Sequence, residues 1–413
     1  MGRGPTHDLV QHAALGTDDE LVRDGGGMTS PRPGPVPRAE PPPDVAEVVL
    51  RLQSEGLRLA VTTEGRKGGA GPSDVGMIWV EDLALTIDTD PSRVWQSPFE
   101  LRDDEAGPAI YEHGRRVAGA RTQSRPRYYD LETSDGVPYW KIALLHLDSL
   151  ASTVLQTCAY WGNEDQCTFC GIGVTLEAGR TIAKKTPAML AEVAVAARDL
   201  DGAVDVTLTT GSTRGPDRGA LYVGQCGQAV KRASGLPVEI QFEPPEDLDV
   251  IDQIADMDAA DTVGIHVETF DPAVLSRVAP AKARTGIEHY FAAWERAVAR
   301  FGPGQVTTYV ILGMGEDPEL TIEGCRRAIE LGVYPFVVPL RPVAGSLMAD
   351  WTPPDPASVE QVARRLTPFL RAKGIGADTA KAGCSRCNAC SPMAAVERSL
   401  LQIGPKPVVA ARA

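Results

Sequence analysis

Residues 150–171 read LASTVLQTCAYWGNEDQCTFCG, a short β-branched run followed by a loop with three cysteines. The cysteines are Cys158, Cys167 and Cys170, and two residues separate the last two. Soft thiolate ligands suit iron, and three of them on one loop can each bind a different iron of a [4Fe-4S] cluster. The fourth iron then has no protein ligand. The loop therefore predicts a catalytic cluster that can bind a small molecule directly.

Beyond this loop, short β-branched runs alternate with longer helical patterns. This alternation favours right-handed βαβ crossovers and a parallel sheet. We expect an α/β fold, a partial (β/α)6 TIM-like barrel over residues 142–346, with its chemistry at the carboxyl ends of the strands. Strands are expected at 150–156, 204–209, 238–242, 263–267, 306–312 and 335–339. Helices are expected at 188–200, 217–233, 246–257, 287–301, 319–331 and 358–373.

The segments that flank the barrel differ from it in composition. Residues 1–43 are rich in glycine and proline and almost lack apolar periodicity, so they predict a disordered leader. Residues 44–141 contain an amphipathic helix at 45–54, strand-like pieces such as 75–79 and polar turns, which predict a small α+β N-terminal domain. Residues 347–413 form a C-terminal extension with a helix and three more cysteines.

Composition limits the possible partners. The 413-residue chain has a formal net charge of -14, which argues against nucleic acid or an anionic membrane as its main partner. No apolar run approaches the length of a membrane-spanning helix, and the N-terminus lacks the order of a secretory signal, so a cytoplasmic protein is expected. Six of the eight cysteines fall into two tight groups, which is typical of metal ligands rather than of a disulfide scaffold.

The first cysteine group resembles the signature of the radical S-adenosylmethionine (SAM) superfamily, in which three cysteines hold the cluster and an aromatic residue precedes the third. Phe169 fills this aromatic position. The first gap has eight residues (159–166), where the common pattern has three. The resemblance implies an enzyme in which SAM binds the open iron and is cleaved reductively to a 5'-deoxyadenosyl radical, which abstracts hydrogen from a small-molecule substrate. It also implies an electron donor such as flavodoxin or ferredoxin.

Later strand ends resemble the superfamily too, beginning with the segment after the second expected strand. Thr210, Gly211 and Ser212 stand where the family receives the methionine amino group of SAM, although the family's glutamate is absent. The resemblance implies cofactor contacts for these three residues. For Gly211, a glycine required by a tight turn is the alternative.

The fourth and fifth expected strands end in further residues of this kind. Glu268 resembles the family acid that binds the ribose of SAM, and Arg284 resembles the basic residue that binds its carboxylate. Gly313 and Gly315 resemble the stretch that packs against adenine. For Arg284 the alternative is a solvated surface charge. His266 is either a substrate or cofactor contact or a core histidine.

The second cysteine group consists of Cys384, Cys387 and Cys390, again at gaps of two residues. This spacing is similar to part of a ferredoxin run and predicts a second, auxiliary iron-sulfur cluster. A zinc knuckle with a distant fourth ligand is the alternative. Cys226 and Cys325 are either that ligand or buried thiols in helices. Arg341, after the last expected strand, either faces an anionic substrate group or forms a structural ion pair.

Two other classes of protein remain open. One is a zinc-binding barrel enzyme, with His146 or His266 as a fourth ligand at the first cysteine group. The other is a non-catalytic iron-sulfur scaffold or electron carrier. Within the superfamily, the stretches after the fourth and sixth expected strands look most like biotin synthase and hydrogenase-maturation proteins. The overall chain, with its long first gap and its C-terminal cysteines, is similar to a subfamily associated with nitrilase-type pathways.

Overall fold

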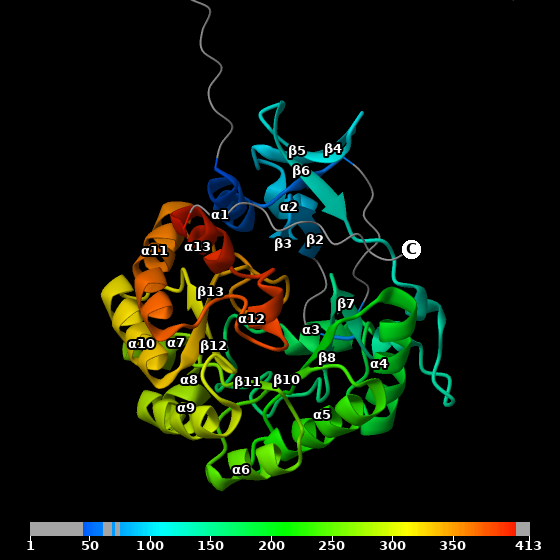
Figure 1. Ribbon diagram of the computed structural model, residues 1–413, viewed down its shortest axis with the longest axis vertical. Helices are drawn as coiled ribbons and strands as arrows, with labels where there is room; N and C mark the ends of the chain where they lie inside the picture. The colour runs from blue at the N-terminus through cyan, green and yellow to red at the C-terminus, as the bar shows by residue number, and fades with distance from the viewer. Residues whose placement is uncertain (1–43, 61–67, 71–74, 402–413) are drawn as a thin grey trace, which may run out of the picture. The chain divides into compact units, whose positions relative to one another are not determined.

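The computed structural model describes residues 44–60, 68–70 and 75–401. The disordered leader predicted at 1–43 lies outside the described residues. Two separate sheets are present, one in the N-terminal domain and one in the barrel (Figure 1).

The N-terminal domain packs one helix against a six-stranded sheet. Asp44 caps the helix by accepting a hydrogen bond from the backbone N–H of Ala46 at 3.1 Å. The elements are α1 (Val45–Glu55), β1 (Arg58–Leu59), β2 (Val75–Val80), β3 (Leu83–Asp88), α2 (Pro91–Val94), β4 (Phe99–Asp104), β5 (Gly107–Glu112) and β6 (Arg115–Thr122). The strand order is β1-β4-β5-β6-β2-β3. The helix expected at 45–54 and the strand expected at 75–79 are confirmed.

The barrel sheet has seven strands in the order β13-β12-β11-β10-β9-β8-β7. They are β7 (Leu144–His146), β8 (Ser149–Thr153), β9 (Asp205–Thr209), β10 (Val238–Gln241), β11 (Thr262–Gly264), β12 (Val306–Leu312) and β13 (Val333–Pro339). β8 to β13 are parallel, whereas β7 pairs antiparallel with β8. Because β13 and β7 are both edges, the barrel is partial, as predicted. The antiparallel β7 was not predicted.

Helices connect the parallel strands, and two 3-10 turns, η1 (Arg127–Asp130) and η2 (Tyr139–Lys141), precede the barrel. The helices are α3 (Ile172–Glu177), α4 (Pro187–Asp201), α5 (Ala220–Ser234), α6 (Asp249–Asp256), α7 (Pro272–Val278), α8 (Pro280–Thr285), α9 (Ile287–Phe301), α10 (Pro318–Leu331), α11 (Pro356–Lys373), α12 (Cys384–Cys387) and α13 (Met393–Leu401). Figure 1 shows α4, α5, α6, α9 and α10 around the outside of the curved sheet. All six predicted helices are present, and β12 and α9 have the bounds that the sequence predicts.

Local chemistry accounts for these helix ends. In α10, the Asp317 side chain accepts from the backbone N–H of Glu319 at 2.8 Å, and Pro318 occupies the first turn, where no N–H is needed. Gly332 ends the helix at φ +104°, a conformation that glycine adopts without strain.

Alternate side chains of the parallel strands face opposite sides of the sheet. Val206 and Ile240 point outward and belong to the main hydrophobic core. Asp205, Glu239 and Gln241 point inward and are buried. The inside of the barrel is therefore lined in part by polar groups, which suits a binding site better than a packed core.

The C-terminal extension lies against both sheets. Ala395 of α13 packs into the hydrophobic cluster of the N-terminal domain. The domain boundaries predicted at 44–141, 142–346 and 347–413 stay predictions. No helix in the described part of the chain is both long and apolar enough to cross a membrane.

Candidate active site

The first cysteine group lies on the loop between β8 and α3, at the carboxyl end of the first parallel strand. Backbone hydrogen bonds fix this loop to the neighbouring strand ends. The N–H of Ala159 donates to the carbonyl of Ser212 at 2.8 Å, and the N–H of Thr168 donates to the carbonyl of Val278 at 2.8 Å. The predicted position of the loop at the barrel mouth is confirmed.

The three thiols of this loop are free and partly buried. Burial raises the pKa of Cys170 to about 11, against the opposing effect of a hydrogen bond from the backbone N–H of Ile172. Burial also raises the pKa of Cys167 above its usual range, and the positive charge of Lys282 opposes this shift. Cys167 interacts electrostatically with Cys170 and Cys158, and Cys170 interacts with Cys158.

These thiols fit an iron-sulfur cluster, because they converge at one partly desolvated place where bound iron would stabilise the thiolates against the cost of burial. Among the described residues, no group of three His, Cys, Asp or Glu side chains is arranged to hold one metal ion. A cluster does not require such an arrangement, since each thiolate binds a different iron. Phe169, beside the third cysteine, packs against the main hydrophobic core.

A buried ion pair lies next to these cysteines. Lys282 of α8 is hydrogen-bonded to the Glu268 carboxylate, and its Nζ also donates to the carbonyl of His266 at 2.8 Å. Both charges act on Cys167 and Cys170. Glu268 has the strained backbone φ of +71°. Its N–H donates to the carbonyl of Tyr309 and its carbonyl accepts from the N–H of Ile311, and these two hydrogen bonds to β12 hold it in place. The structure thus places the predicted Glu268 at the first cysteine group.

Arg284 occupies a different position from Lys282, although only one residue separates them. Residues two apart on a helix face nearly opposite directions. The Arg284 side chain is 62% exposed and pairs with Asp165 of the cysteine loop at 2.7 Å. Lys282 was not among the predicted site residues. The carboxylate-binding role of Arg284 stays a prediction.

A second buried carboxylate, Glu243, connects the cysteine loop to β10. It accepts hydrogen bonds from Ser212 Oγ at 2.6 Å and Tyr160 OH at 3.1 Å, and it pairs with Arg218. Burial is the main cause that raises the pKa of Tyr160 above its usual range. These contacts keep the strand end and the cysteine loop in one rigid arrangement, and neither Tyr160 nor Arg218 was predicted as a site residue.

The segment Thr210, Gly211 and Ser212 lies directly against the cysteine loop. The N–H of Gly211 donates to the carbonyl of Leu155 at 2.9 Å. A Cβ on Gly211 would lie 2.1 Å from the carbonyl oxygen of Thr157. Close approach of the loop, rather than a tight turn, therefore explains this glycine. The cofactor contacts of the segment stay predictions.

The glycine stretch after β12 forms a turn. Gly313 and Gly315 have φ of +100° and +91°. The Glu316 carboxylate accepts from the N–H groups of Gly313 and Met314, both at 2.8 Å. The turn is preformed, and its contact with adenine stays a prediction.

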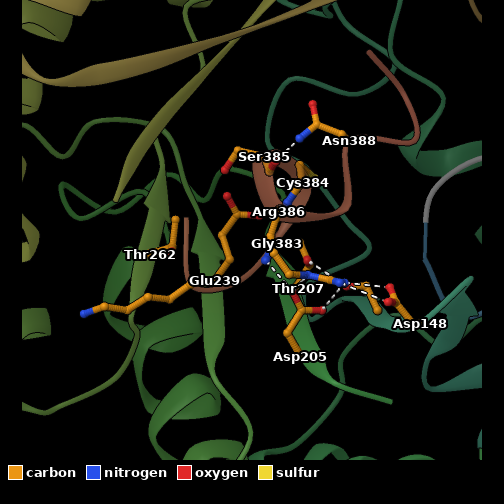
Figure 2. Close-up of polar contacts among 12 residues, drawn as sticks. Asp148, Asp205, Thr207, Glu239, Thr262, Gly383, Cys384, Ser385, Arg386 and Asn388 are labelled. Atoms are coloured by element: carbon orange, nitrogen blue, oxygen red, sulfur yellow. Dashed lines mark hydrogen bonds and ion pairs between the residues drawn. The ribbon is translucent and has the colours of Figure 1, made fainter. Parts of the chain in front are cut away.

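The second cysteine group lies elsewhere in the barrel, and the segment that carries it begins near the amino ends of β9 and β10, where Gly383 and Cys384 lie beside Asp205 and Glu239 (Figure 2). The N–H of Gly383 donates to Asp205 at 2.7 Å, and the N–H of Cys384 donates to Glu239 at 2.9 Å. Asp205 is the first residue of β9 and Glu239 the second residue of β10. The extension therefore enters the polar inside of the barrel from the end opposite to the first cysteine group.

Arg386 fixes this extension. Its guanidinium bridges Asp205, with Nε at 2.7 Å, and Asp148, with Nη2 at 2.7 Å, as Figure 2 shows. Burial raises the pKa of Cys387 to about 12, and it raises the pKa of Cys384 well above its usual range. Cys226 and Cys325 lie in α5 and α10 and are buried in the main core.

His266 lies between residues that contact the two cysteine groups, Lys282 and Tyr309, whereas Arg341 lies between the second group and the N-terminal domain. His266 Nδ1 accepts from the backbone N–H of Tyr309 at 3.1 Å, so the neutral ring carries its proton on Nε2. Arg341 donates to Thr86 Oγ1 at 2.5 Å and to the carbonyl of Cys390 at 3.2 Å. Arg341 thus contacts the N-terminal domain and the second cysteine group.

The parallel strands form a partial barrel, and three cysteines and a buried ion pair lie at its carboxyl-end mouth. This arrangement is typical of a barrel enzyme with a metal centre. Residues 161–332 match the model of the radical SAM superfamily. This segment is a radical SAM domain, and the chain is an enzyme of the radical SAM type. The radical SAM family implies a [4Fe-4S] cluster and SAM as cofactors.

Individual relatives are distant. The chain is 25% identical over 336 residues to a bacteriochlorophyllide c C-7(1)-hydroxylase from Chlorobaculum limnaeum, covering 74% of this chain and 79% of the relative. The structure of methylornithine synthase is 18% identical, with a TM-score of 0.42, and the match covers 54% of this chain and 62% of that protein. A radical SAM methyltransferase from Sphaerobacter thermophilus is 17% identical, with a TM-score of 0.40, covering 69% of this chain and 77% of that protein. The narrower resemblance to a subfamily associated with nitrilase-type pathways stays a prediction.

Proposed function

We propose that the chain uses a [4Fe-4S] cluster on Cys158, Cys167 and Cys170 to carry out SAM-dependent hydrogen abstraction from a small-molecule substrate. The convergence of three partly buried thiols beside the Lys282–Glu268 pair is the observation that supports this most. When bound, the cluster supplies one electron that cleaves SAM into methionine and a 5'-deoxyadenosyl radical.

The protein's own residues bind and orient the cofactor and the substrate. We assign Thr210, Gly211 and Ser212 to the methionine amino group, and Glu268 to the ribose hydroxyls, which a carboxylate accepts well. The Lys282 ammonium holds the Glu268 carboxylate in one orientation. Arg284 is assigned to the carboxylate of SAM, which requires its exposed side chain to exchange Asp165 for the ligand.

Gly313 and Gly315 are assigned to the adenine, because their turn lets the backbone approach a flat ring. The substrate would then lie at the carboxyl-end mouth of the barrel, beside the first cysteine group. The name of the Chlorobaculum relative describes a hydroxylation at carbon, and such a reaction also begins from a C–H bond. An electron donor such as flavodoxin or ferredoxin completes the proposal.

We also assign an auxiliary iron-sulfur cluster to Cys384, Cys387 and Cys390. The support is that three thiols meet at one partly buried place, where burial disfavours free thiolates unless a metal binds them. Zinc at this place is the alternative.

The proposed activity is tested by anaerobic incubation of reconstituted protein with dithionite and SAM. Wild type should release 5'-deoxyadenosine, and a Cys167→Ala variant should release none above background. A Cys226→Ala variant is the matched control, because Cys226 is buried in α5 away from both groups. Equal release from wild type and the Cys167→Ala variant would contradict the assignment.

Metal analysis separates the remaining alternatives. The proposal expects about eight irons per chain and about four in a Cys387→Ala variant, as two four-iron clusters require. Zinc in place of iron at either group would overturn the corresponding assignment. Iron without SAM cleavage would identify a scaffold or an electron carrier.

A further inference from the structure

We propose that the N-terminal domain forms one wall of the auxiliary metal centre, and that Thr86, Gln241 and Tyr309 ease reduction of that centre by donating hydrogen bonds to its cysteine sulfurs. This inference rests on the proposed auxiliary cluster. It assigns a role to a domain whose sequence contains no ligand-like clustering.

Thr86 of β3 contacts the cysteine segment from the N-terminal domain. Its side chain is buried, with 1% of the residue exposed, and its Oγ1 lies 3.2 Å from Cys390 Sγ and 3.2 Å from the carbonyl of Ala389. A hydroxyl has one proton, so only one of these acceptors can receive it. The direction of that single hydrogen bond decides whether Thr86 acts on the sulfur.

The other donors to the Ala389 carbonyl determine which acceptor receives the Thr86 hydroxyl proton. This oxygen already accepts from the backbone N–H of Thr86 at 2.8 Å and from Gln53 Nε2 at 3.1 Å, which occupy its two lone pairs. Arg341 donates to Thr86 Oγ1 at 2.5 Å and fills an acceptor position of the hydroxyl. The hydroxyl proton of Thr86 is therefore directed at Cys390 Sγ.

The other sulfurs receive donors from the barrel. Tyr309 OH lies 3.1 Å from Cys384 Sγ, and Gln241 Nε2 lies 3.2 Å from the same sulfur. Cys387 receives the backbone N–H of Ala389. Each of the three sulfurs thus has a hydrogen-bond donor aimed at it, an arrangement that suits thiolates better than thiols.

The N-terminal domain also covers the centre with apolar side chains. Met77 packs with Ala389 in one hydrophobic cluster, against which Trp79, Ala84 and Cys387 lie. Strands of the N-terminal domain therefore close one side of the cysteine segment, and Arg386 and its carboxylates hold the segment from the barrel side. A centre enclosed in this way gains or loses electrons in an environment set by both domains.

Hydrogen bonds to cluster thiolates stabilise the more negative, reduced state, and they raise the reduction potential. Arg341 adds a positive charge near Cys390 in the same direction. Removing one donor should therefore make the auxiliary centre harder to reduce. A cluster on the first cysteine group, whose neighbours are the Lys282–Glu268 pair, should not respond.

The test is a redox titration of full-length, reconstituted Thr86→Val protein, followed by electron paramagnetic resonance. Valine keeps the shape of threonine and removes the hydroxyl. We expect the reduced-to-oxidised ratio of the auxiliary centre to fall about tenfold at a fixed potential, or about 59 mV for a one-electron couple. A Thr367→Val variant is the matched control, since Thr367 is also buried and its hydroxyl donates to the Ala363 carbonyl within α11.

Tyr309→Phe supplies an independent variant, because it removes only the hydroxyl aimed at Cys384. A negative shift of the auxiliary centre alone in either variant supports the inference. An unchanged potential in both variants, or an equal shift of both clusters, overturns it. A wild-type iron content of about four per chain overturns the auxiliary cluster itself, so that failure is recognised before any potential is compared.

Amide hydrogen exchange tests directly whether β3 of the N-terminal domain contacts the auxiliary centre. Amides of residues 83–88 in the full chain should exchange more slowly after reconstitution of wild type, and no slowing should occur in Cys387→Ala protein. If reconstitution leaves these amides unchanged while iron is incorporated at the second group, the N-terminal domain is not part of the centre.

Discussion

Replacing Arg386 with methionine should destabilise the fold by about 3 kcal/mol at pH 8, because it leaves a buried carboxylate without its cation. Asp205 is fully buried and accepts from Arg386 Nε at 2.7 Å. Breaking a buried ion pair from one side costs roughly 3–5 kcal/mol. The low end applies, since Asp205 keeps its hydrogen bond from the N–H of Gly383 at 2.7 Å. The other partner, Asp148, has a side chain 48% exposed, so its loss should cost about 0.5 kcal/mol.

The cost should also depend on pH. Burial raises the pKa of Asp205, and the positive charge of Arg386 opposes that shift. The native state therefore holds a proton on Asp205 more readily than the unfolded state, and the free energy of unfolding falls as pH rises through this window. Without Arg386 the pKa of Asp205 rises further, so the pH range over which the free energy of unfolding falls extends to higher pH. The difference between variant and wild type should shrink as pH falls, because a protonated Asp205 needs no cation.

The assay is urea unfolding at pH 5.5 and pH 8, followed by circular dichroism and tryptophan fluorescence, with the shift in midpoint multiplied by a common m value. Asp148→Asn tests the exposed half of the bridge. Arg365→Met is the matched surface control, since Arg365 pairs with Glu319 in solvent. The reasoning is refuted if Arg386→Met costs no more than Asp148→Asn, or if its cost is the same at both pH values.

Three further changes test the surroundings of the first cysteine group. Gly211→Ala should lower the iron content of the first cluster, because its Cβ would lie 2.1 Å from the Thr157 carbonyl oxygen. Gly224→Ala is the control and should leave the iron content unchanged, because the nearest atom to its Cβ would lie at 3.4 Å. Burial lowers the pKa of Lys185 to about 7, so the free energy of unfolding of wild type should rise by roughly 1.4 kcal/mol per pH unit between about pH 7 and 10. Urea unfolding of Lys185→Met protein should show a flatter pH dependence over this range. Lys282→Met should cost roughly 3–5 kcal/mol in urea unfolding, because its buried carboxylate partner loses its cation, and a cost below about 1 kcal/mol would contradict the pairing.

The sequence by itself determined the barrel and its first cysteine loop. Strand β12 and helix α9 have the bounds expected from periodicity, because a buried parallel strand and an amphipathic helix each leave a local pattern that needs no distant residue. The position of Cys158, Cys167 and Cys170 followed equally directly, since a loop after the first parallel strand must lie at the carboxyl-end mouth. β7 escaped prediction because it is three residues long and pairs only with its neighbour.

Tertiary structure alone decided which charges face the cysteines and where the second group lies. Lys282 rather than Arg284 points inward because of the rotation of the short helix α8, which no spacing rule on the chain reveals. Cys384 meets Glu239 and Arg386 meets Asp148 across a large separation in sequence, and contacts of this kind leave no periodic trace. Thr86 reaches Cys390 from another domain for the same reason: folding joins distant segments through burial and charge, which local pattern does not record.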